Sequence, residues 1–97
     1  MKVIELVKNS DLRCADYERK SPEEDECQIA VHYAGVCSSD IHRAFAGGAY
    51  FYPLVMGHEI SGTIEICGLK VADRFNSGDR VAVFPLIPCQ KCQFCKR

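Results

Sequence analysis

The sequence predicts a mainly β domain, built from short antiparallel strands that form a barrel or a sandwich. Several segments of about four to eight residues are rich in alternating apolar or β-branched residues, and clusters of turn-forming residues separate them. Helical periodicity is confined to one short stretch near residue 40. The sequence contains no internal repeat, no low-complexity tract and no linker long enough to divide two domains, so we expect one domain over its 97 residues.

Three strands are expected in the N-terminal third. Residues 2–7 and 12–17 form the first two, separated by the turn-prone Asn9-Ser10-Asp11. Residues 19–26 are polar and charged, which indicates an exposed loop. Residues 27–34 form the third strand, and its alternate residues share one face: Cys27, Ile29, Val31 and Tyr33.

One short helix is expected after the third strand. Ser38-Ser39-Asp40 supplies N-cap candidates, the helix continues through Phe45, and Gly47-Gly48 ends it. A loop through residues 50–53 follows.

Two further strands are expected in the C-terminal half. Residues 60–67 are rich in β-branched side chains, and Gly62 inside them indicates a bulge or a close approach of another backbone. Residues 76–79 form a turn that leads into a last strand over residues 80–84, which prolines close.

Charge and hydropathy exclude several classes of function. Twelve basic and thirteen acidic residues leave a net charge of -1, so we expect no binding to nucleic acid or to an anionic membrane. No apolar run approaches the roughly 20 residues that a membrane span needs, and the N-terminus becomes charged too soon for a signal peptide. The cytoplasm is the expected location.

The seven cysteines favour metal chemistry over disulfides. Their number is odd, no export signal precedes them, and three of them stand in metal-ligand spacing. The isolated Cys14, Cys27 and Cys67 lie in apolar or alternating stretches, where a free cysteine behaves as a small buried hydrophobe, so we expect these three to be packing residues.

The first candidate metal site is the C-x-x-C-x-x-C motif of Cys89, Cys92 and Cys95. Structural zinc takes four protein ligands in tetrahedral geometry, and this motif supplies three. Either a group outside the chain completes the site, or the chain is a piece of a longer protein. The second interpretation is favoured.

The second candidate metal site combines Cys37 with the adjacent pair His58 and Glu59. Catalytic zinc uses such mixed thiolate, imidazole and carboxylate sets, with one position left for water or substrate. Spacing alone does not show that the three side chains meet. The alternative is a buried thiol and a hydrogen-bonded histidine that do not share a ligand.

The order and spacing of four motifs resemble the zinc-dependent medium-chain alcohol and polyol dehydrogenases. The motifs are Gly35-Val36-Cys37-x-Ser39-Asp40-x-His42, Gly57-His58-Glu59-x-x-Gly62, Gly78-Asp79-Arg80-Val81 and the cysteine triplet. The match covers nearly the whole chain. Residues 48–53 and 85–89 are most similar to the sugar-alcohol subgroup, the galactitol-1-phosphate 5-dehydrogenases and sorbitol dehydrogenases.

The resemblance implies a fold and a role for each candidate residue. The fold is a GroES-like, partly open β-barrel with one short helix. Cys37 and His58 ligate a catalytic zinc, and Glu59 lies beside it, directly or through water. Ser39 begins a proton relay and His42 extends it toward solvent, unless His42 is an ordinary surface histidine. Asp40 accepts the second ring proton of His58, or is simply a helix cap.

The resemblance also implies that residues 1–97 are the N-terminal portion of a catalytic domain. Cys89, Cys92 and Cys95 are then three of four ligands of a structural zinc. No G-x-G-x-x-G fingerprint follows a strand, so the Rossmann domain that seats NAD or NADP is absent. We therefore expect the chain alone to hold zinc weakly and to be inactive, and the whole enzyme to act on a small alcohol or polyol as a homo-oligomer.

Two other classes compete with the enzyme. A zinc-ribbon module that binds nucleic acid is disfavoured by the single C-x-x-C cluster and by the charge balance. A stand-alone GroES-like module with a structural or interaction role is the stronger alternative, because a fold does not determine a function.

Overall fold

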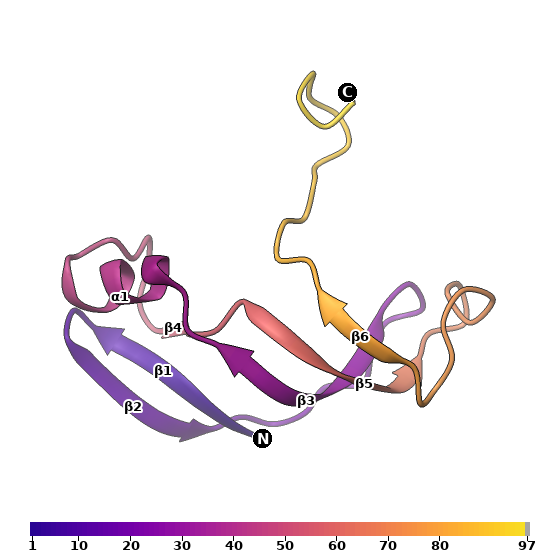
Figure 1. Ribbon diagram of the computed structural model, residues 1–97, viewed down its shortest axis with the longest axis horizontal. Helices are drawn as coiled ribbons and strands as arrows, with labels where there is room; N and C mark the ends of the chain where they lie inside the picture. The colour runs from indigo at the N-terminus through magenta and orange to yellow at the C-terminus, as the bar shows by residue number, and fades with distance from the viewer. Residues whose placement is uncertain (97) are drawn as a thin grey trace.

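Within residues 1–96, six strands form two three-stranded sheets, and one helix packs beside the first of them (Figure 1). The computed structural model describes residues 1–96. The elements are β1 (Lys2–Lys8), β2 (Asp11–Asp16), β3 (Cys27–Gly35), α1 (Ser38–Phe45), β4 (Leu54–Val55), β5 (Glu59–Cys67) and β6 (Arg80–Val83). The predicted mainly β architecture with one short helix is confirmed.

The first sheet has the order β2-β1-β4. β1 and β2 form an antiparallel hairpin from Lys2↔Asp16 to Lys8↔Asp11, and its turn places Ser10 at φ 62°. Leu6 lies on the central strand and is fully buried. The two-residue β4 pairs with β1 on the other side and was not predicted, because so short a strand has no periodicity of its own.

The second sheet has the order β3-β5-β6, with all pairs antiparallel. The β3–β5 ladder runs from Cys27↔Cys67 at one end to Gly35↔Glu59 at the other. His32 is left between the pairs Val31↔Gly62 and Tyr33↔Ser61, which is a bulge. A Cβ atom at residue 62 would overlap the carbonyl oxygen of Ala30, so the predicted close approach of another backbone at Gly62 is confirmed. The bulge itself lies at His32 on the facing strand β3 and not at Gly62.

Helix α1 begins one residue earlier than the N-cap candidates suggested. The N-cap is Cys37, and Asp40 is the third helical residue. The Asp40 carboxylate accepts a hydrogen bond from the backbone N–H of Cys37, with Oδ2 3.0 Å from the nitrogen. The Asp40 side chain thus binds the backbone N–H of the N-cap residue, which is one of the two hydrogen bonds of a capping box. The predicted end at Phe45 is confirmed.

Contacts at its C-terminal end hold α1 against the first hairpin. The backbone N–H of Ser10 donates to the carbonyl of Ala44 at 2.7 Å, and the N–H of Gly47 donates to the Asn9 side chain at 3.0 Å. Ala44 is 2% exposed. The helix is therefore fixed by its C-terminal half, and its N-terminal turn faces the junction of the two sheets (Figure 1).

Burial corrects two expectations about packing. Along the predicted shared face of β3, Cys27 and Ile29 are half-buried, whereas Val31 and Tyr33 are 51% and 77% exposed. Cys14 is also exposed: it lies on β2 at the edge of its sheet, opposite the equally exposed Ile4. Cys27 and Cys67 are half-buried, so they are less enclosed than the buried hydrophobes that the sequence predicted.

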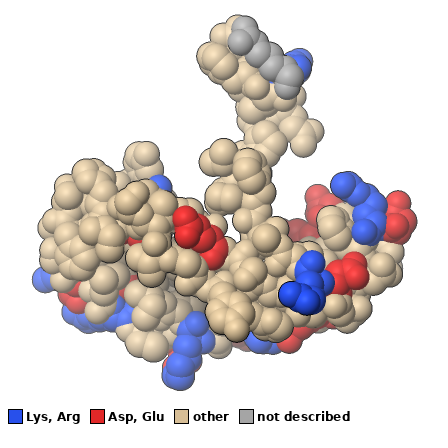
Figure 2. Space-filling model, viewed as in Figure 1, with Lys and Arg blue, Asp and Glu red and all other residues tan. Residues whose placement is uncertain are grey.

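The segment after β6 projects away from both sheets and carries the cysteine motif at its end (Figure 1). On the face shown in Figure 2, positive and negative side chains are interspersed and do not gather into a basic stripe. Within residues 1–96, no helix has the length and apolarity to cross a membrane.

Candidate metal centres

The β3–β5 ladder brings Cys37 and His58 together. Cys37 lies two residues after the end of β3, and His58 directly precedes β5. Because Gly35 and Glu59 are partners in the ladder, the residues just beyond each strand end lie side by side. The ligand atoms of Cys37, His58 and Glu59 all lie within 4.8 Å of one another. The two motifs therefore meet in the folded chain.

Gly35 makes room for the third member of this cluster. A Cβ atom at Gly35 would lie 2.5 Å from Oε2 of Glu59, which is closer than real Cβ contacts. A larger residue at position 35 would displace the Glu59 side chain from its present position. Sequence reasoning quoted Gly35 as part of a motif but did not assign it this steric role.

Asp40 connects the helix cap to the histidine. Asp40 is 7% exposed, with Oδ1 3.2 Å from Nδ1 of His58 while Oδ2 accepts a hydrogen bond from the N–H of Cys37. The two roles weighed for Asp40, helix cap and partner of His58, are thus compatible. A proton on Nδ1 facing Asp40 leaves the lone pair of Nε2 available to a metal ion.

The thiol and the imidazole of the cluster shift each other's pKa in opposite directions. Hydrogen bonds from Ser39 and His58 lower the pKa of Cys37, and the Ser39 contribution is the largest. The neighbouring Cys37 and the charge of Asp40 raise the pKa of His58. Both shifts favour a thiolate beside a protonated imidazole when no cation is present. The thiolate is also the form of cysteine that binds metals.

The two predicted relay residues both lie on α1, but they differ in solvent exposure. Ser39 is half-buried, and its hydroxyl accepts a hydrogen bond from Arg43, with Nη1 2.9 Å from Oγ. His42 is exposed, and its ring lies against Gly48, outside the Cys37–His58–Glu59 cluster. Arg43 was missed by sequence reasoning. Its i,i+4 spacing from Ser39 on the predicted helix is the signal that could have found it.

The second cluster is the cysteine loop. Sγ of Cys95 lies 3.6 Å from Sγ of Cys89 and 3.4 Å from Sγ of Cys92, and all three sulfurs are within 4.8 Å of one another. Sulfurs at about 2.3 Å from a tetrahedral zinc lie roughly 3.8 Å apart, so the loop is already close to the spacing that a zinc ion requires.

Backbone N–H groups of the same loop stabilise the thiolate forms of its cysteines. The N–H groups of Lys91 and Cys92 lower the pKa of Cys89 to about 7, and the N–H of Cys95 lowers the pKa of Cys92. Gln90 adopts φ 55° in this turn. Successive N–H groups that point inward in this way stabilise thiolates. The donor set and its surroundings therefore fit a soft divalent cation.

Hollows adjoin the cluster of Cys37, His58 and Glu59, called the mixed cluster below. His58 lines one hollow of 500 Å³ with Asp40, Arg43, Tyr50 and Phe51, and a second of 550 Å³ with Glu59 and residues of β6. Tyr50 and Phe51 had been assigned only to a loop.

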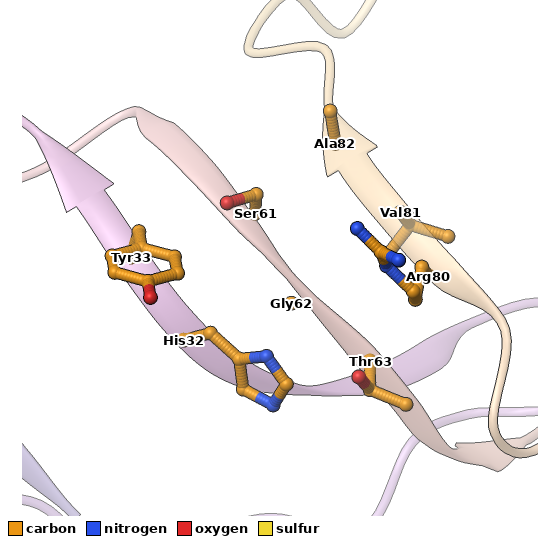
Figure 3. Close-up of a pocket in the computed structure, with 8 residues that line it drawn as sticks. All are labelled: His32, Tyr33, Ser61, Gly62, Thr63, Arg80, Val81 and Ala82. Atoms are coloured by element: carbon orange, nitrogen blue, oxygen red, sulfur yellow. The ribbon is translucent and has the colours of Figure 1, made fainter.

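A third hollow, of 320 Å³, lies on the face of the second sheet and does not include Cys37 or His58 (Figure 3). Its polar lining residues come from β3, β5 and β6: His32, Tyr33, Ser61, Thr63 and Arg80.

Comparison with known proteins gives consistent matches. Residues 23–97 match the family described as alcohol dehydrogenase GroES-like domain. Galactitol 1-phosphate 5-dehydrogenase of Escherichia coli K12 is 43% identical over 72 residues, which are 74% of this chain and 20% of that protein. Sorbitol dehydrogenase of Homo sapiens is 39% identical over 90 residues, which are 89% of this chain and 25% of that protein.

Solved structures agree with the sequence matches. Galactitol-1-phosphate dehydrogenase from Escherichia coli superposes with a TM-score of 0.91 at 36% identity, covering 99% of this chain and 28% of that one. Short chain alcohol dehydrogenase rspB from Escherichia coli CFT073, complexed with NADH, gives a TM-score of 0.83 at 34% identity, covering 99% and 28%. The chain thus spans about a quarter of the length of the relatives that it matches.

Proposed function

We propose, because the chain belongs to the alcohol dehydrogenase GroES-like domain family, that residues 1–97 are the N-terminal portion of the catalytic domain of a zinc-dependent oxidoreductase. The enzyme transfers a hydride between an alcohol or polyol and NAD or NADP. The observation that carries this proposal is the convergence of Cys37, His58 and Glu59 within 4.8 Å. The relatives are themselves dehydrogenases of sugar alcohols.

Cys37, His58 and Glu59 would hold the catalytic zinc. One thiolate, one imidazole and one carboxylate are the donor types that catalytic zinc uses, and three protein ligands leave a coordination position for substrate or water. A zinc ion bound there supplies Lewis-acid chemistry, which lowers the pKa of a substrate hydroxyl. Asp40 holds the imidazole in the tautomer that ligation needs, because its Oδ1 faces Nδ1.

The neighbouring side chains of α1 would move the proton that the alcohol loses. Ser39 accepts this proton at Oγ and releases its own hydroxyl proton toward solvent. Arg43 donates to the same oxygen, so it orients the hydroxyl and favours its deprotonated form. His42 is exposed on the same helix and completes the path to solvent.

The hollow beside His58 is the proposed binding place of a polyol. This hollow combines the charged Asp40 and Arg43 with the aromatic Tyr50 and Phe51. Hydroxyl groups of a sugar alcohol would pair with the Arg43 guanidinium and the Tyr50 hydroxyl, and its carbon chain would pack against the aromatic rings. The names of the relatives, galactitol 1-phosphate and sorbitol dehydrogenases, point to the same substrate class.

Cys89, Cys92 and Cys95 would hold a structural zinc, with a fourth ligand from outside the described residues. Within residues 1–96, no βαβ unit with a glycine-rich turn is present to seat a nicotinamide dinucleotide. We therefore infer that this chain alone is inactive and that other segments of the whole enzyme bind the cofactor. A homo-oligomeric whole enzyme is part of the same proposal and rests only on the resemblance to the family.

Metal analysis combined with an activity assay tests this proposal. The intact enzyme should contain about two zinc ions per subunit, and it should reduce NAD or NADP in the presence of sugar alcohols or their phosphates. Zinc at that level without hydride transfer to either cofactor from any alcohol would favour the stand-alone GroES-like module. Absence of zinc from the intact protein would overturn the proposal.

A further inference from the structure

The end of the β3–β5 ladder remote from the mixed cluster carries a second pair of thiols. Cys27 is the first residue of β3 and Cys67 is the last residue of β5, and the two are direct partners in the antiparallel register. Their Sγ atoms lie 3.6 Å apart. The Cys37–His58–Glu59 cluster lies beyond the opposite end of the ladder, at Gly35↔Glu59.

The hydrogen bonds around this pair place the two cysteines at a close position in the ladder. The N–H of Gly68 donates to the carbonyl of Glu26 at 2.8 Å, so the flanking pair Glu26 and Gly68 is a hydrogen-bonded one. Cys27 and Cys67 therefore form a non-hydrogen-bonded pair, because the two kinds alternate. In such pairs the Cα atoms are about 4.5 Å apart and the side chains approach most closely. This separation lies within the range of about 4.4–6.8 Å that disulfides require.

We propose that Cys27 and Cys67 are a dithiol modification site, which a low-molecular-weight disulfide such as oxidised glutathione converts into a cross-strand disulfide. One cysteine thiolate attacks a sulfur of the small disulfide, forms a mixed disulfide and releases one small thiol. The other cysteine thiolate then attacks the protein sulfur of the mixed disulfide and releases the second small thiol. Two protein thiols are oxidised, one small disulfide is reduced, and the two protons leave on the released thiols.

Accessibility and surroundings are consistent with such a site. Both cysteines are half-buried, so a small reagent can reach them although they pack in the sheet. Burial and the neighbouring Cys27 raise the pKa of Cys67, which lowers its thiolate fraction at a given pH and slows its attack on a small disulfide. The bond would tie together β3 and β5, the strands that position Cys37 and His58.

Peptide mapping of the metal-loaded intact protein tests the proposal directly. The protein is equilibrated with mixtures of reduced and oxidised glutathione, alkylated, and digested with trypsin and chymotrypsin, which separate Cys27 from Cys37 by cutting after Tyr33. We expect a linked Cys27–Cys67 peptide in the wild type and in Cys14→Ser, a control at an exposed lone thiol. Cys27→Ser and Cys67→Ser should lack this peptide and carry glutathione on the remaining cysteine.

The concentration dependence distinguishes an internal disulfide from simple glutathione attachment. An internal bond releases two small thiols for each disulfide consumed. At a fixed ratio of reduced to oxidised glutathione, about tenfold dilution of total glutathione should therefore raise the ratio of linked to reduced Cys27–Cys67 about tenfold. A mixed disulfide would not respond to this dilution. Glutathione on both cysteines without a link, or links confined to Cys89, Cys92 and Cys95, would overturn the proposal.

Discussion

The two candidate metal centres contain similar atoms but are built in different ways. Cys89, Cys92 and Cys95 lie within one short turn, and their sulfurs are mostly exposed. Cys37 and His58 are separated along the chain and meet only because β3 and β5 pair up to Gly35↔Glu59. One cluster is a property of a loop, and the other is a property of a sheet.

This difference predicts which structural changes disturb each metal centre. A local turn brings its ligands together at a low cost in loop-closure entropy, so the cysteine loop can retain its geometry even when distant packing changes. The mixed cluster depends on strand register, since a slip by one residue would move every side chain of the strand to the opposite face. Changes in the ladder should therefore damage the mixed cluster alone, and changes in the loop should leave it intact.

The largest effect is expected from Cys37→Ser. Replacing the thiolate removes one ligand of the mixed cluster, so turnover of the intact enzyme should fall by more than the roughly 100-fold that outer-sphere substitutions cost. Zinc content should fall by one ion per subunit, and circular dichroism should report an unchanged fold. Cys14→Ser is the matched control at an exposed thiol. Retained turnover would remove Cys37 from the mechanism.

A smaller effect is expected from Asp40→Asn. The amide keeps a hydrogen-bonding group at the helix cap but loses the charge that faces Nδ1 of His58. Zinc affinity of the mixed cluster or kcat should fall by about 10- to 100-fold, and the cysteine loop should keep its metal. Asp16→Asn, which affects only an exposed ion pair with Lys2, is the control. Equal losses in both variants would contradict a specific role for Asp40.

Gly62→Ala should disturb the ladder without touching any ligand. The new methyl group would overlap the backbone carbonyl oxygen of Ala30, which cannot swing aside, so we expect a loss of about 1–3 kcal/mol in unfolding free energy. Zinc should be released from the mixed cluster at lower chelator concentration than in the wild type. In the control Gly48→Ala, the methyl group meets the exposed His42 ring, which can rotate away. A Gly62→Ala protein as stable as this control would argue against the steric role.

The smallest effect on turnover is expected from Cys92→Ser. The loop should lose its zinc, and the free energy of unfolding should fall, because structural zinc contributes directly to folding. Since the loop projects from the sheets, we expect a loss on the order of 1 kcal/mol, seen as faster proteolysis near residues 89–95. Turnover at low temperature should stay near that of the wild type. Unchanged stability and unchanged zinc content would count against a structural ion there.

Most of the fold could be predicted from local pattern. Among residues 1–96, five of the six strands, the helix and the close backbone approach at Gly62 follow from alternation, capping residues and glycine placement. The exposure of Cys14 could not be predicted, because it depends on which strand lies at the edge of the sheet. Cys37 as N-cap was missed because the N-cap preferences favour serine and aspartate.

The sequence by itself determined the cysteine loop, because three thiols at a spacing of three residues fall together in any tight turn. The sequence also identified the three residues of the mixed cluster, but it did not show that their side chains lie close together. Only the tertiary structure decided that Cys37, His58 and Glu59 share one place, that Asp40 joins the helix cap to the imidazole, and that Cys27 faces Cys67. The physical reason is that strand register is a long-range property, fixed by backbone hydrogen bonds between segments that no local pattern connects.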